Sequence, residues 1–192
     1  MIFVRTYPAP PIDEAQVLRY ARASAEDAAV ARLLRECEKE AENACCFRVC
    51  YRTLDVKLVG DTCDFGAFCV HSHDLAAHLA GHEKALLFAA SIGIGFDRLL
   101  AKYSRLSPAK AWLLQALGTE RAETLCDLFC ADAAREYRLA LAARFSPGYG
   151  DLPLATQKDV FVALDCERKI GLTLNDSLVM SPAKSVTAFV GL

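Results

Sequence analysis

The sequence has 192 residues, of which 54% are hydrophobic, and it carries 22 basic against 24 acidic residues. A chain of this length and apolar content can build one hydrophobic core, so we expect a single domain over residues 1–192. The balanced charge includes no basic block, which argues against nucleic acid and against an anionic membrane surface as partners.

No segment has the pattern of a targeting or membrane-spanning element. Residues 1–8 are too short, and too soon interrupted by Pro8, to form a signal peptide. The longest apolar run, at residues 85–95, is far below the ~20 residues that a membrane helix requires. We therefore expect a cytoplasmic protein without a membrane partner.

The first half of the chain has the periodicities of a mixed α and β domain. Ser24 and Asp27 have the spacing of a capping pair that opens a helix. The alternation of apolar residues with Arg48, Cys50 and Arg52 predicts a strand with one face in water. The expected elements are, in chain order, helices at 12–22 and 24–44, a strand at 47–52, β-like runs at 56–59 and 65–70, a short helix at 74–79 and a buried strand at 84–92.

A glycine-rich turn follows the buried strand and leads into a helix that is expected to end near Leu106. The strand, Gly93-Ile94-Gly95 and the helix together are similar to a phosphate-binding turn. However, Arg98 occupies the position of the third glycine, and no Lys-Ser/Thr pair follows. The pattern therefore favours a tight turn in which Asp97 caps the helix.

The second half begins with a strong helix start, in which the cap residue Ser107 precedes Pro108 at the first helical position. Helical spacing continues to about Leu141, although Gly118 is a position at which the helix can kink or divide. Trp112 is expected in the core. The remaining expected elements are a helix at 155–164 and strands at 170–174 and 185–191.

Cysteine and histidine do not form a strong metal-binding pattern. The nine cysteines include no Cys-x-x-Cys pair, and Cys126 and Cys130, one helical turn apart, have no second pair at that spacing. This favours reduced thiols over a metal or cluster. His78 and His82 stand four residues apart, but Gly81 weakens that helical geometry, so surface or capping roles are favoured for the histidines. The sequence identifies no Ser/His/Asp or Cys/His catalytic set.

The most informative segment is residues 144–153, which combines an arginine, two prolines, two glycines and a tyrosine. Proline fixes φ and glycine allows positive φ, so the segment is expected to be a rigid loop. Arg144 offers a planar fork of donors for a carboxylate or phosphate, and Tyr149 offers a flat face for a base, ring or sulfonium. From these residues alone, a purely architectural surface turn is an equally good interpretation.

The pattern Arg-x-x-Pro-Gly-Tyr-x-x-x-Pro, from Arg144 to Pro153, resembles the signature of the activation domain of cobalamin-dependent methionine synthase. The resemblance covers roughly residues 141–190. The first 140 residues are similar, less specifically, to shorter free-standing members of that family, through residues 12–20 and 89–93. Further sub-motifs follow in the expected order at 156–158, 170–177, 180–182 and 185–187.

The resemblance implies an α+β single domain, with a mixed, mainly antiparallel twisted sheet and helices packed around it. It implies binding of S-adenosylmethionine and support of the reductive methylation, or reactivation, of an oxidised cobalamin. That cobalamin is carried by a partner methyltransferase such as a truncated methionine synthase, with a flavodoxin-type protein as electron donor. Such a chain is a component of a methyltransferase system rather than a complete enzyme.

Four site residues are implied by the same resemblance, and no catalytic or metal-binding residue is. Arg144 matches the arginine that contacts S-adenosylmethionine, and its fork is expected to engage the ligand carboxylate. The backbones of Ser146 and Gly148 match positions that line the ligand. Tyr149 matches the signature tyrosine.

The sequence also departs from the family pattern. The family's acidic contacts near the N-terminus and before the arginine have no counterpart that we can place, since residues 139–143 are apolar. The family's tyrosine pair would follow Leu192, the last residue given. A second function therefore stays open: a docking module for a corrinoid protein that has lost S-adenosylmethionine binding.

Overall fold

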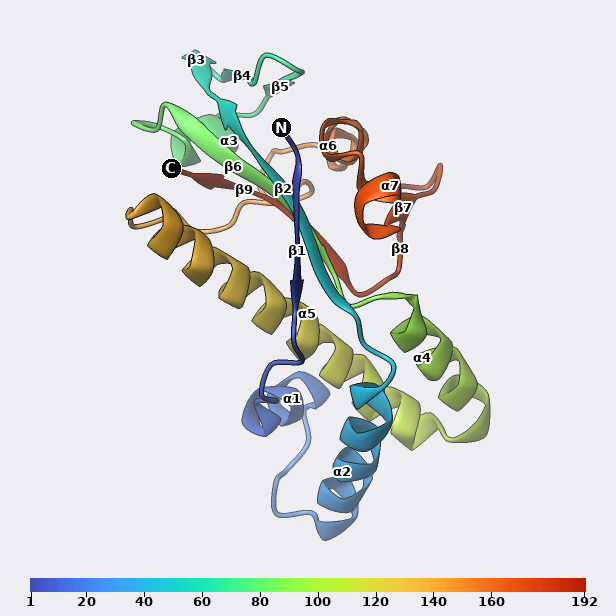
Figure 1. Cartoon of the computed structure of the whole chain (residues 1–192). Coiled ribbons are helices and arrows are strands. Elements are labelled where there is room, and N and C mark those ends of the chain that lie inside the picture. Colours follow the sequence, from blue (N-terminus) through green and yellow to red (C-terminus); the bar gives the residue numbers. More distant parts are fainter.

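The computed structural model describes all 192 residues and is built around a four-stranded antiparallel sheet (Figure 1). β6 and β2 lie in its middle, and the registers pair each strand with its neighbour in the antiparallel sense. The strands are, in spatial order, β1 (Phe3–Tyr7), β2 (Phe47–Asp55), β6 (Lys84–Ser91) and β9 (Ser185–Gly191).

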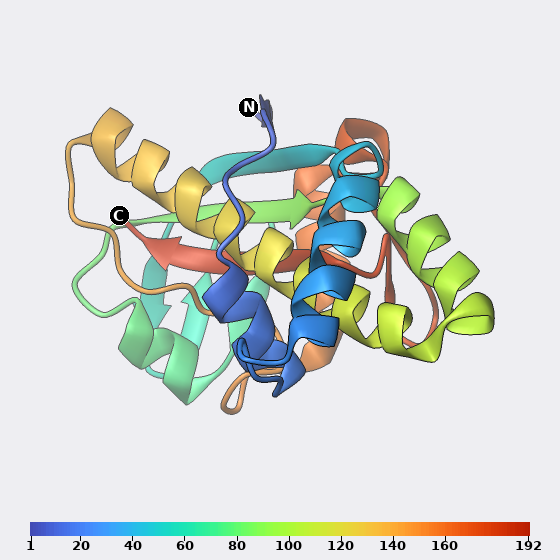
Figure 2. The same cartoon turned by 90° about the horizontal axis from the view of Figure 1, so that it is seen from below.

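Seven α-helices surround this sheet, and the longest of them, α5, runs for 30 residues across one face (Figures 1 and 2). No helix combines the length and the apolar character needed to cross a membrane. The helices are α1 (Glu14–Ala21), α2 (Ala28–Glu42), α3 (His73–His78), α4 (Ile94–Leu106), α5 (Pro108–Tyr137), α6 (Gln157–Leu164) and α7 (Cys166–Ile170), with a 3-10 turn, η1 (Leu154–Thr156), before α6.

Two small sheets complete the fold. One has three strands, β3 (Lys57–Val59), β4 (Thr62–Asp64) and β5 (Cys69–His71), and the other pairs β7 (Thr173–Leu174) with β8 (Met180–Ser181). The expected run at 65–70 is thus wrong, because the hairpin turn falls inside it. The strand expected at 170–174 is shortened, because α7 extends to Ile170. The α+β class with an antiparallel sheet and helices around it is confirmed.

Both faces of the main sheet are buried, and each has its own core. Alternating side chains point to opposite faces, so Val49 and Phe88 pack with α1, α2, α4 and α5, whereas Cys50 and Leu87 pack with α3, α6 and α7. In the first core the rings of Phe88 and Phe129 are 4.9 Å apart and fully buried. Burial of each such ring contributes about 1.5–3 kcal/mol.

The expectation that β2 has one face in water is wrong. Cys50 is fully buried, and α6 and α7 cover the arginines on either side of it. Arg48 Nη2 donates to the carbonyl of Lys169 (2.6 Å), and Arg52 Nη1 donates to that of Ala163 (3.2 Å). Both carbonyls lie in the last turn of a helix, where a cation satisfies acceptors that have no partner within the helix.

Three details of the expected helices are also wrong. Asp97 does not cap α4, whose N-cap is Gly93; instead its Oδ2 accepts the Ala183 N–H (2.8 Å). Gly118 neither kinks nor divides α5. Trp112 is 43% exposed rather than in the core, because it lies on the outer side of α5.

The start of α2 also differs from the expected capping pair. Asp27 alone is the N-cap, and its carboxylate accepts the N–H groups of Ala29 (2.8 Å) and Val30 (3.3 Å). Ser24 instead accepts the N–H of Glu26 in the preceding turn (3.2 Å).

Candidate functional site

The signature loop, residues 144–153, begins as an extra strand-like segment on the free edge of β9. Phe145 and Phe189 exchange both backbone hydrogen bonds, at 2.9 and 2.8 Å. Because side chains alternate along an extended chain, this bridge turns Phe145 toward one side and Arg144 and Ser146 toward the other. Phe145 packs against the core under α6.

The loop then closes on itself through backbone hydrogen bonds. The Gly148 N–H donates to the Leu152 carbonyl (2.9 Å), and the Tyr149 N–H donates to the Ser146 carbonyl (3.1 Å). Gly148 has a φ of 93°, in the region that glycine adopts without strain. Tyr149 stands at the tip with 67% of its surface exposed. The expected loop is therefore closed by its own backbone hydrogen bonds, and it displays its tyrosine to solvent.

A cleft of about 420 Å³ lies beside this loop, within the range of ~300–1,000 Å³ that is typical of small-molecule sites. Three of the four expected site residues line it, namely Arg144, Ser146 and Tyr149. Gly148 does not line it and serves the turn instead. Three of the four downstream sub-motifs also meet here, through Gln157, Met180 and Thr187, whereas no residue of 170–177 lines the cleft.

The polar floor of the cleft is fixed by hydrogen bonds. Thr187 Oγ1 donates to Gln157 Oε1 (2.9 Å), and both residues are buried. Ser185 Oγ donates to the Pro182 carbonyl (2.8 Å) and lies 2.9 Å from Ser91 Oγ. The first contact joins β9 to the start of α6, and the Ser185 contacts join β9 to β6 and to the turn before β9.

Arg144 is already paired in this structure. Its Nη2 lies 2.8 Å from Glu123 Oε2 and 3.0 Å from Asp127 Oδ1, both on α5, while its Nη1 is shielded from solvent without a hydrogen-bond partner. Burial opposes the charge of Arg144, but Cys126 and the two carboxylates outweigh it and raise its pKa. With one cation and two anions, the three charged groups carry a net charge of −1.

Glu123 is the charged residue of the cleft that sequence reasoning missed. It lines the cleft with Arg144, yet it lies 21 residues earlier in the chain, on a different element. An acid was sought at 139–143, where α5 has already ended. Only the packing of the signature loop against α5 brings the two residues together. Gln157 and Thr187 belong to recognised sub-motifs, but they were not assigned to the site.

His78 and His82 contact backbone carbonyls instead of forming a common site. His78 Nε2 lies 2.7 Å from the Ala143 carbonyl, and His82 Nδ1 lies 3.0 Å from the Leu192 carbonyl. The structure brings together no group of three or more His, Cys, Asp or Glu side chains with the geometry to hold a metal ion. Cys126 is buried in the core beneath Arg144.

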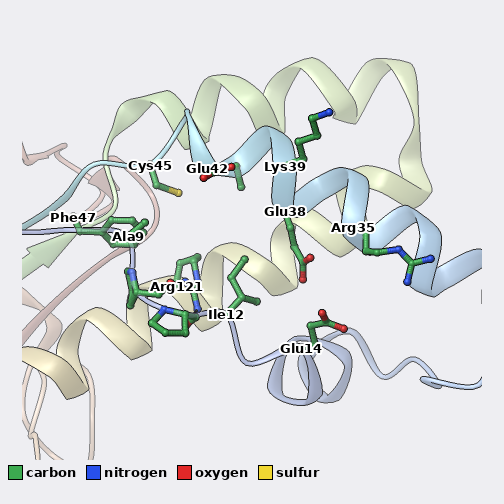
Figure 3. Close-up of a pocket in the computed structure, with 13 residues that line it drawn as sticks. Ala9, Ile12, Glu14, Arg35, Glu38, Lys39, Glu42, Cys45, Phe47 and Arg121 are labelled. Carbon is green, nitrogen blue, oxygen red and sulfur yellow. Dashed lines mark hydrogen bonds between the residues drawn. The ribbon is translucent and has the colours of Figure 1, made fainter.

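A second, larger cavity of about 660 Å³ lies between α2, α5 and the segment before α1 (Figure 3). Glu14 and Glu38 face one another there, and burial raises the pKa of Glu38. Arg121 is nearly fully buried and donates to the carbonyls of Pro10 (2.6 Å) and Pro11 (2.7 Å). None of the signature residues lines this cavity, so the smaller cleft remains the candidate site despite its size.

Comparison with known proteins identifies the family of the chain and a solved structure with a similar fold. The family described as vitamin B12 dependent methionine synthase, activation domain, matches residues 67–191. A crystal structure described as the MetH reactivation domain bound to AdoHcy is similar in fold, with a TM-score of 0.76 and 14% sequence identity. The similarity covers 100% of this chain and 78% of that one. A search of curated protein sequences finds no match.

Proposed function

Since the chain belongs to the family of the activation domain of vitamin B12-dependent methionine synthase, we propose that it binds S-adenosylmethionine in the cleft beside the signature loop. We further propose that it supports the reductive methylation of an oxidised cobalamin carried by a partner methyltransferase. A truncated methionine synthase is the type of partner expected, with a flavodoxin-type protein as electron donor.

One observation supports this proposal above the others: sub-motifs that are far apart in the sequence line a single cleft. Arg144 and Tyr149 come from the loop, Gln157 from the start of α6, Met180 from β8 and Thr187 from β9. A turn with a purely architectural role gives no reason for these separate segments to meet around one hollow.

The charge of the cleft fits the proposed ligand. S-adenosylmethionine has a sulfonium, an ammonium and a carboxylate, and so carries a net charge of +1 at neutral pH. Arg144 and Glu123 line the cleft, and Asp127 just outside it brings the net charge of the three groups to −1. In this arrangement Glu123 receives the ammonium, and Arg144 turns one pair of donors to the carboxylate. The exposed face of Tyr149 is available to the sulfonium or the adenine ring.

The chain's own role is to bind and orient the ligand. S-adenosylmethionine supplies the methyl group, and the cobalamin of the partner accepts it. Tyr149 lies at the rim between the cleft and solvent, with 67% of its surface exposed. A ligand held at this rim presents its methyl group to a docked partner, and holding two reacting groups together is itself a large contribution to rate.

Calorimetric titration with S-adenosylmethionine tests the proposal. We expect saturable binding by the unchanged chain and a loss of at least about tenfold in affinity for Arg144→Ala, because a charge-assisted pair is removed. Arg168→Ala is the matched control, since Arg168 forms a surface pair with Asp165 (2.9 Å) away from the cleft. No binding by the unchanged chain at millimolar ligand would contradict the proposal.

The alternative, a docking module without S-adenosylmethionine binding, is favoured by one observation. Arg144 Nη2 is shared by two carboxylates of α5 and Nη1 is shielded from solvent, so the arginine is already engaged within the protein. The alternative predicts that the chain binds a cobalamin-carrying methyltransferase in gel filtration, and that this binding survives Arg144→Ala. It also predicts that the unchanged chain does not bind the methyl donor.

A further inference from the structure

The signature loop is fastened to a distant part of the chain through the carboxylate of Asp151. Asp151 accepts the hydroxyl hydrogen of Ser72, the N–H of His73 (2.8 Å) and the N–H of Asp74 (3.2 Å). Ser72 is the N-cap of α3, and its hydroxyl also accepts the N–H of Leu75 (3.0 Å). Two of the first N–H groups of α3 are thus satisfied by a residue 77 or 78 positions away.

The attachment is reciprocal. The backbone N–H of Asp151 donates to Asp74 Oδ2 (3.1 Å), so each aspartate accepts a backbone N–H of the other. Gly150, just before Asp151, has a φ of 52°, and a Cβ at this position would overlap the Asp74 carboxylate. Only glycine therefore allows the loop to approach α3 this closely.

These contacts also keep the Asp151 carboxylate charged. The Ser72 hydroxyl and then the two backbone N–H groups lower the pKa of Asp151. His73 lies beside it and is in turn paired with Asp61 (Nδ1 to Oδ1, 3.0 Å). The three groups that hydrogen-bond to the carboxylate are all donors.

The fastened end of the loop leads directly to the cleft. The next residue, Leu152, is 2% exposed, its carbonyl accepts the Gly148 N–H and its N–H donates to the Tyr149 carbonyl (3.0 Å). Most of the surface of Tyr149 itself is in solvent. The position of the tip therefore depends on its backbone turn, and that turn depends on where Asp151 is held.

We propose that Asp151 is a positioning residue for ligand binding, which holds Tyr149 and the Ser146 carbonyl at the cleft by anchoring the loop to α3 through Ser72 and Asp74. The expected effect on ligand binding rests on the proposed function. The anchoring of the loop does not, because it can be measured without any ligand.

Two measurements on Asp151→Ala and on Ser72→Ala test the proposal. In the ligand-free chain, amide hydrogen exchange at Gly148 and Leu152 is expected to quicken by about tenfold, the change that corresponds to the loss of one capping interaction. Exchange in β6 is expected to stay unchanged. In calorimetry, S-adenosylmethionine affinity is expected to fall by a similar factor, and Asp151→Asn to lie between the unchanged chain and Asp151→Ala.

Asp27→Ala is the matched control, because Asp27 is also an aspartate that caps a helix, α2, but it has no contact with the loop. It is expected to lower the melting temperature comparably and to leave the affinity and the exchange of the loop unchanged. An unchanged exchange rate at Gly148 in Asp151→Ala would overturn the proposal, as would faster exchange with undiminished affinity. If the unchanged chain binds no S-adenosylmethionine, the proposed function fails, and the exchange rates alone decide whether Asp151 anchors the loop.

Discussion

At the scale of single residues, the balance of charge around Arg144 decides what the cleft can bind. Its two partners are not equivalent: the side chain of Glu123 is 41% exposed and lines the cleft, whereas that of Asp127 is 72% exposed and does not. An ion pair that is largely in water contributes little to stability. A ligand carboxylate can therefore displace Asp127 at low cost and leave Glu123 in place for an ammonium.

This difference predicts opposite effects for two neighbouring substitutions. Asp127→Asn removes a competitor for Arg144 and is expected to raise S-adenosylmethionine affinity about two- to fivefold. Glu123→Gln removes the partner of the ammonium and is expected to lower affinity about tenfold. Asp132→Asn on the same helix, which is paired with Arg135 instead, is the control. Equal losses in Asp127→Asn and Glu123→Gln, measured by titration calorimetry, would show that the ligand does not use the arginine in this way.

At the scale of elements, α5 shows what could and could not be predicted from the sequence. Ser107 and Pro108 defined its start correctly, because the cap and the fixed φ of proline act locally. The stripe of Ala111, Leu114 and Leu117 defined its buried face, and it also places Trp112 outside that stripe. The expectation of a core tryptophan followed residue type rather than helical position and was therefore wrong.

The behaviour of Gly118 depends on its neighbours in space. Phe96 of α4 packs against it, and a Cβ on Gly118 would lie 2.8 Å from Phe96 Cζ. The glycine is a site of close helix packing, so α5 continues without a break. The same dependence on neighbours in space explains why only part of the candidate site could be predicted. The signature loop could be recognised from local sequence, whereas its contact with Glu123 depends on how α5 crosses the sheet.

Gly118→Ala is therefore expected to destabilise the protein, although alanine favours a helix by about 1 kcal/mol. Overpacking against Phe96 costs about 1–3 kcal/mol, so the melting temperature should fall by a few degrees. In Gly118→Ala/Phe96→Leu part of the overlap is relieved, and the double-mutant cycle should show a favourable coupling. Ser104→Ala, at an exposed position of α4, is the control. A rise in melting temperature for Gly118→Ala would refute the packing explanation.

At the scale of the whole molecule, the two-faced sheet determines the environment of the nine cysteines. Cys46 and Cys69 are exposed, Cys45 and Cys130 are partly buried, and the other five lie in the two cores. At neutral pH, two equivalents of a thiol-specific reagent are expected to react rapidly with the native protein. Cys46 should react faster than Cys69, because desolvation and the neighbouring Asp64 raise the pKa of Cys69. Cys46→Ser/Cys69→Ser should lose the rapid phase, and a rapid phase of more than four equivalents would contradict the placement of the cores.

The buried thiols also make stability depend on alkaline pH. Burial raises the pKa of Cys37 and of Cys126 to about 12, from an ordinary value of 9. A thiol with a raised pKa in the folded state contributes its full stability below pH 9. That contribution is lost as the pH rises toward 12, because the unfolded chain releases the proton first. In reducing buffer, the free energy of unfolding should therefore fall between pH 9 and 11. Cys126→Ala should reduce that slope by up to ~1.4 kcal/mol per pH unit, whereas Cys46→Ala, which removes an exposed thiol, should leave the slope unchanged. A slope that is the same in both variants would mean that Cys126 is not held in the core as a neutral thiol.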